Sequence, residues 1–77
     1  MKKVEVEWED AFHGDGPIGV DEFEHFIPFI VTTIGFVVYE NKTCLCLGFS
    51  IYKREGLIKN WQVIPKKLIL KRKTLGE

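Results

Sequence analysis

The sequence predicts a mainly β protein: a small, partly open, five-stranded barrel of the SH3-like or Sm-like kind, with one short helix at about residues 21–27. Residues 29–39 and 43–52 are dense in β-branched and aromatic residues and flank a polar tip, which is typical of a hairpin. Each half contains one glycine, where a long strand can bend. A chain of 77 residues has room for one domain, so residues 1–77 are assigned to a single domain.

The first strand is expected at residues 4–9, where three apolar residues alternate with three glutamates. Residues 10–19 contain three glycines and one proline, a density that ends regular structure and predicts a mobile surface loop. The short helix follows, because Asp21 as N-cap and Glu24 three residues later form a capping-box pattern. Pro28 then ends the helix, since it cannot continue the helical hydrogen bonds.

After the hairpin, residues 53–60 are expected to form a polar connection. A short strand at residues 61–64 is interrupted by Pro65, and residues 66–67 form a tight turn before the last strand at residues 68–73. Partial closure into a barrel is an economical way for so small a sheet to hide its edges.

The charges are separated along the chain although the net charge is zero. Residues 1–40 contain two lysines against nine carboxylates, a net charge of −7, and residues 41–77 contain nine cations against two carboxylates, a net charge of +7. One explanation is that the acidic first strand lies beside the basic last strand. The other is a basic face for nucleic acid opposite an acidic face.

Several short motifs resemble a group of small proteins encoded by phages and prophages. They are Trp8-Glu9-Asp10 at the end of the first strand, the glycine-containing loop, Thr33-Ile34-Gly35-Phe36, and Ile64-Pro65-Lys66 followed by Ile69. The resemblance covers nearly the whole chain, but Val20 stands where members of the group usually have tryptophan. It implies a mobile-element origin and a host-cytoplasm location, and it brings no catalytic residues.

The leading hypothesis is a non-catalytic accessory protein that binds a host or phage protein, for example to inhibit a host defence. Its expected protein-binding surface is acidic and comprises Glu5, Glu7, Glu9, Asp10, Asp21, Glu22 and Glu24. The alternative is RNA or single-stranded DNA binding through a C-terminal basic surface. That surface comprises Trp61, Lys66, Lys67, Lys71, Arg72 and Lys73. Each set also has a simpler explanation, a solvated outer face or an edge strand protected by lysines.

Two further hypotheses concern assembly. Long apolar strands in so short a chain suggest a homo-oligomer joined by edge-strand pairing between the 43–52 strand and the last strand. An oligomeric sponge for a nucleotide signal would use the loop at residues 11–19 over a pocket.

No catalytic residue, metal or cofactor is assigned. Cys44 and Cys46 with His13 and His25 could formally hold zinc, but structural zinc normally uses paired ligands on tight knuckles. The glycines at 14–19 fit the dinucleotide-binding letter pattern without the strand and long helix that it needs. The sequence has no apolar signal region after its first residues and no segment long enough to cross a bilayer, so a cytoplasmic location is expected and membrane partners are not.

Overall fold

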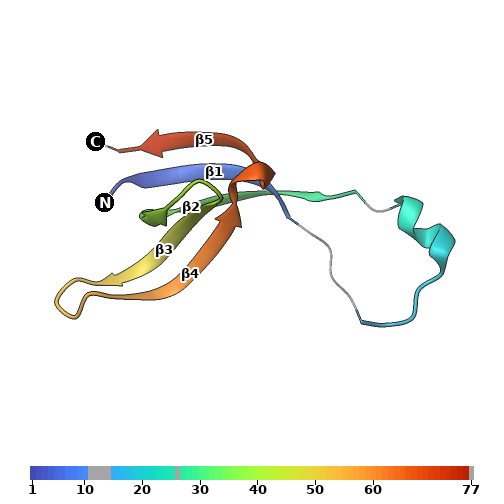
Figure 1. Ribbon diagram of the computed structural model, residues 1–77, viewed down its shortest axis with the longest axis horizontal. Coiled ribbons are helices and arrows are strands. Elements are labelled where there is room, and N and C mark those ends of the chain that lie inside the picture. Colours follow the sequence, from blue (N-terminus) through green and yellow to red (C-terminus); the bar gives the residue numbers. More distant parts are fainter. Residues whose placement is uncertain (11–14, 26, 77) are drawn as a thin grey trace.

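The computed structural model describes residues 1–10, 15–25 and 27–76 (Figure 1). The elements in chain order are β1 (Lys3–Asp10), the 3-10 helix η1 (Val20–His25), β2 (Phe29–Glu40), β3 (Cys44–Tyr52), β4 (Leu57–Pro65), the 3-10 helix η2 (Lys66–Leu68) and β5 (Ile69–Leu75). The prediction of a mainly β chain with five strands is confirmed. The helix expected at about 21–27 is instead a six-residue 3-10 helix, and residue 26 lies outside the described residues.

The five strands form one antiparallel sheet in the order β4-β3-β2-β1-β5. Among the described residues, β4 and β5 are the two ends of this order and are not paired with each other, so the sheet is not closed. The expected pairing between copies through the 43–52 strand stays a prediction. Within the chain β3 is paired with β4 from Cys44 to Tyr52 and with β2 from Leu45 to Gly48, so residues 45–48 are covered on both sides. The edges belong to β4 and β5.

The core lies on one face of the sheet. Its fully or almost fully buried side chains are Val4, Val6, Trp8, Leu45, Leu47 and Ile64. The three β1 members alternate with glutamates, as the period-two pattern predicts. The indole N–H of Trp8 donates a hydrogen bond of 2.9 Å to Oγ1 of Thr33 on β2, so the one polar atom of this buried ring is satisfied.

Two glycines allow the long strands to pack closely. A Cβ added to Gly35 would lie 2.9 Å from Cε1 of Phe49 and 3.2 Å from the carbonyl oxygen of Gly48. A Cβ added to Gly48 would lie 2.8 Å from Cγ2 of Ile58 and 3.0 Å from Cγ1 of Val38. Any larger residue at Gly35 would therefore push apart β2 and β3, and any larger residue at Gly48 would also push against β4.

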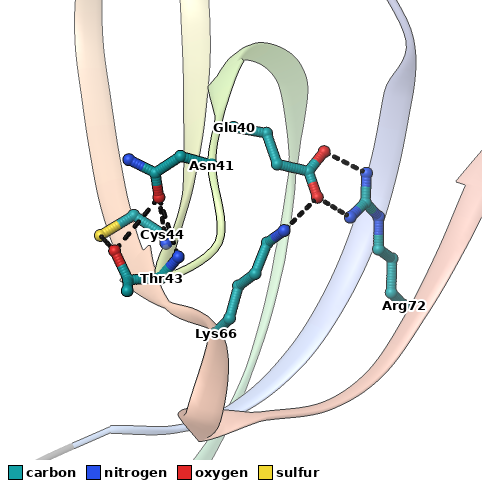
Figure 2. Close-up of polar contacts among 6 residues, drawn as sticks. All are labelled: Glu40, Asn41, Thr43, Cys44, Lys66 and Arg72. Carbon is teal, nitrogen blue, oxygen red and sulfur yellow. Dashed lines mark hydrogen bonds and ion pairs between the residues drawn. The ribbon is translucent and has the colours of Figure 1, made fainter.

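The side chain of Asn41 stabilises the β2–β3 turn (Figure 2). Its Oδ1 accepts hydrogen bonds from the backbone N–H of Thr43 at 2.9 Å and of Cys44 at 2.8 Å. This side chain stands in for a backbone acceptor, which is a common role of asparagine in turns. The tip at residues 40–42 is thus confirmed as a hairpin turn.

The β3–β4 connection is shorter than predicted. The sequence suggested a polar connection over residues 53–60, but β4 begins at Leu57 and pairs in register with the end of β3 at Tyr52. The turn closes in four residues because Gly56, with φ of 68°, donates its N–H to the carbonyl of Tyr52 at 2.8 Å. Cross-strand pairing therefore begins β4 at Leu57, so that residues 57–60 belong to the strand and not to the connection.

Strand β4 and strand β5 are joined by the tight turn that Pro65 predicted. This turn is η2, and the backbone N–H of Lys66 ties it to the carbonyl of Thr43 at 2.8 Å. The last strand, β5, begins immediately after it, one residue later than expected.

The described residues between β1 and β2 lie outside the sheet and include η1 (Figure 1). We call the described residues 15–25, 27 and 28 the arm. The molecule measures 51 × 25 × 21 Å along its principal axes, and the arm lies at one end of the longest of these. No helix within the described part of the chain is long and apolar enough to cross a membrane.

Candidate binding surfaces

A three-residue ionic cluster occupies the end of the sheet beside the β2–β3 turn (Figure 2). The Arg72 guanidinium donates two hydrogen bonds to the Glu40 carboxylate, of 2.7 and 3.1 Å. The ammonium of Lys66 lies 2.8 Å from the same carboxylate. Hydrogen bonds from Arg72 first and Lys66 second lower the pKa of Glu40 from 4.5 to about 2, and Glu40 in turn raises the pKa of Arg72.

The predicted basic surface is divided by the fold. Lys66 and Arg72 are engaged by Glu40, while Lys71 and Lys73 lie directly opposite Glu7 and Glu5 on β1. Of the last two members, Lys67 lies on η2 and Trp61 lies on β4. Strand β4 is at one end of the strand order and β5 is at the other. The explanation that the acidic first strand lies beside the basic last strand is therefore confirmed.

The predicted acidic surface is also divided. Glu5, Glu7 and Glu9 project from the half-buried side of β1, between β2 and β5, and Asp10 ends that strand. The other members are exposed on η1 at the far end of the arm (Figure 1), and they are Asp21, Glu22 and Glu24. Residues 15–30 contain no lysine or arginine, so the side-chain charges of Asp and Glu in the arm have no cation beside them in the sequence.

A third surface, which sequence reasoning did not identify, crosses β2, β3 and β4 on the side opposite the core. Tyr39, Cys46 and Val63 are successive cross-strand partners, and Trp61 lies two residues before Val63. Trp61 is 65%, Tyr39 60% and Val63 46% exposed. We call Tyr39, Cys46, Trp61 and Val63 the aromatic face.

The neighbouring row shows that this side is distinct from the core. Glu40, Leu45 and Ile64 are successive partners one position along each strand, and Leu45 and Ile64 are fully buried. Strand periodicity then places the aromatic face on the outside. Beside the aromatic face, side-chain atoms of Val38 and Ile58 lie over Gly48, because a Cβ added to Gly48 would meet them.

Exposed lysines flank the aromatic face along the chain. Lys42, Lys59 and Lys67 are exposed and lie within four residues of Tyr39, Trp61 or Val63 in the sequence. Within the same sequence distance the one carboxylate is Glu40, which is already bound by two cations. The sequence neighbours of the aromatic face therefore have a positive balance. The alternation of Trp61 and Val63 in the sequence indicates that these two side chains share one side of a strand. Only the register across three strands brings Tyr39 and Cys46 beside them.

The remaining predicted sites gain little from the structure. Cys44 and Cys46 are free and half-buried on β3, whereas His13 lies outside the described residues. The loop at 11–19 is described only from Asp15, and its described part is exposed. A surface hollow is lined by Met1, Phe36, Ile51 and Lys53, not by the loop that a nucleotide sponge would use.

Comparison with known protein families, with curated proteins and with solved structures finds no match to this chain.

Proposed function

We propose that this chain is a non-catalytic binding protein whose aromatic face takes up a segment of a partner protein. The observation that carries this proposal is the outer surface formed by exposed Tyr39 on β2 and exposed Trp61 and Val63 on β4, joined through Cys46 on the β3 strand between them. Tyrosine and tryptophan are enriched in protein interfaces, and clustered exposed apolar side chains mark binding surfaces. Because the side chains stand on paired strands, little conformational entropy is lost when a partner binds.

The charges around the face define the partner's chemistry. Lys42, Lys59 and Lys67 favour a segment that combines apolar anchors with carboxylates. The proposal includes a phage or mobile-element origin and action in the host cytoplasm. The target is a host or phage protein, and inhibition of a host defence is one way in which binding could act. They rest on the resemblance of Trp8-Glu9-Asp10 and the other short motifs.

The proposal includes a partly open SH3-like or Sm-like barrel. Three features support it: the order of five antiparallel strands, the 3-10 turn η2 between β4 and β5, and the Glu40 ion pairs that join β2, η2 and β5 at one end. In such an arrangement the aromatic face lies on the outside of the curved sheet, where a partner can reach it.

The test is selection of a random peptide library on the immobilised protein, followed by affinity measurement for the enriched peptides. We expect aromatic or aliphatic anchors together with Asp or Glu. Trp61→Ser should weaken binding by roughly tenfold or more, as for a buried interface anchor. Leu70→Ser, at a similarly exposed apolar position on β5, is the matched control and should leave affinity unchanged. Equal binding by both variants would contradict the proposal.

Single-stranded nucleic acid is the second candidate, since exposed Trp61 and Tyr39 among lysines could also stack bases. The measurement is fluorescence anisotropy with short labelled RNA and single-stranded DNA from about 50 to 200 mM salt. Binding that falls steeply with salt and is lost on charge reversal of Lys59 and Lys67 would favour nucleic acid. If Lys71, Arg72 and Lys73 must be reversed instead, the C-terminal basic surface is the site.

A further inference from the structure

We propose that the arm of one copy docks on the aromatic face of a second copy, and that the exchange is reciprocal, giving a two-fold symmetric dimer. This inference rests on the proposed function, because it assigns an occupant to the same face. It differs from edge-strand pairing, since side chains rather than backbone hydrogen bonds would join the two copies.

The arm has the composition that the aromatic face favours. Val20 is 87% and Ile27 77% exposed, and they lie on either side of the acidic turn of η1. Asp15, Asp21, Glu22 and Glu24 are the charged residues of this segment, and all are carboxylates. The arm is thus an acidic segment with apolar anchors, which is the chemistry inferred for the partner.

Charge complementarity favours a second copy as the occupant. Asp21, Glu22 and Glu24 on the arm would meet Lys42, Lys59 and Lys67 around the aromatic face. The two halves of the chain carry −7 and +7, so two antiparallel copies place opposite charges together twice. A dimer formed in this way also covers two apolar surfaces of each chain that water otherwise contacts.

The chain's own arm is badly placed to cover its own face. The arm joins β2 at Phe29, whereas Tyr39 lies ten residues further along the same strand, a separation of at most about 33 Å. From Phe29 the arm extends away from the sheet (Figure 1). A second copy in the opposite orientation brings its arm toward Tyr39 without any reversal of the chain.

Light scattering after size exclusion tests the dimer across a concentration series. We expect the mass to approach twice the 8.9 kDa chain mass at high concentration. The arm variant Val20→Ser/Ile27→Ser and the face variant Tyr39→Ser/Trp61→Ser should each be monomeric at concentrations where the unchanged protein is dimeric. Leu70→Ser should remain a dimer. Circular dichroism confirms that each variant is folded, which is expected because all five positions are exposed.

Mixing the two monomeric variants gives the decisive result. One supplies an intact face and the other an intact arm, so one of the two interfaces re-forms and a weaker heterodimer appears. Charge reversal of Asp21, Glu22 and Glu24 should likewise be complemented by charge reversal of Lys42, Lys59 and Lys67.

The failure of this inference is distinguishable from the failure of the proposed function. A mass of one chain at all concentrations, a dimer that survives both sets of substitutions, or a mixture that stays monomeric overturns the dimer. The second of these results, a dimer that survives both sets of substitutions, favours strand addition at β4 or β5. Peptide selection that still depends on Trp61 would then leave the proposed function standing. A complementing dimer would overturn partner binding alone if the monomeric arm variant, whose face is free, selects no peptide.

Discussion

Glu40 joins three elements that are distant in the sequence. Its carboxylate ends β2 and binds Lys66 on η2 and Arg72 on β5, and its side chain is 31% exposed. At such exposure solvent screens the ion pairs, so the cluster contributes modestly to the free energy of unfolding. Its larger role is geometric, because a bidentate arginine holds β5 at a defined distance from the β2–β3 turn.

The pH dependence of this cluster is the first prediction. The folded-state pKa of Glu40 is about 2, below its ordinary value of 4.5, so its contribution is fully present above about pH 4.5 and is lost as pH falls through about 2. Glu40→Gln should lower the melting temperature at neutral pH, and the difference from the unchanged protein should shrink over this acidic window. Thermal melts across the pH range measure it.

Glu55→Gln is the matched control, because Glu55 lies in the exposed β3–β4 turn. It should change the melting temperature little at any pH. A Glu40→Gln penalty that stays constant down to about pH 2 would show that the carboxylate's charge is not the cause.

At the scale of the element, the positions and types of the strands could be predicted because each depends on a local pattern. The alternation in β1, the glycine-bearing halves of the hairpin and the turn after Pro65 all proved correct. Residues 57–60 were missed because their place in β4 depends on pairing with β3, which local composition does not reveal. The helix was predicted from its capping pattern, but the structure forms a 3-10 helix there.

The close packing within the hairpin gives a prediction for Gly35, which is buried. Gly35→Ala should cost about 1–3 kcal/mol, the usual range for overpacking, because the added methyl would meet the ring of Phe49 and the backbone of Gly48. Urea unfolding measures the loss.

Two variants make this prediction specific. Gly16→Ala is the control, since no atom lies within 4 Å of its added Cβ, and it should change stability by less than about 0.5 kcal/mol. In the double variant Gly35→Ala/Phe49→Leu the smaller side chain relieves part of the clash, so the loss should be less than the sum of the two single losses. Strict additivity would mean that the ring is not what limits the space at Gly35.

At the scale of the whole molecule, the candidate site was only partly accessible from the sequence. Charge counting gave two explanations, one of which placed the acidic first strand beside the basic last strand, and β1 and β5 are paired in this way. The aromatic face was not predicted, because Tyr39, Cys46 and Val63 are brought together only by the register of three strands. Of its four members, Trp61 was singled out for nucleic-acid binding and Cys46 for a formal zinc set, each with different neighbours. Register is a property of the assembled sheet, so local patterns could not supply it.

The separation of arm and sheet predicts how amide hydrogen exchange is distributed. We expect the slowest exchange on β1 and β3, since both are paired on two sides and supply buried side chains such as Val6 and Leu47. The arm amides should exchange fast at low protein concentration and become protected as the concentration rises, because docking on a second copy orders them. Residues 53–55, in the exposed β3–β4 turn, should exchange fast at both concentrations and so provide an internal control. Arm protection that is already complete at the lowest concentration would mean that the arm is ordered within its own chain.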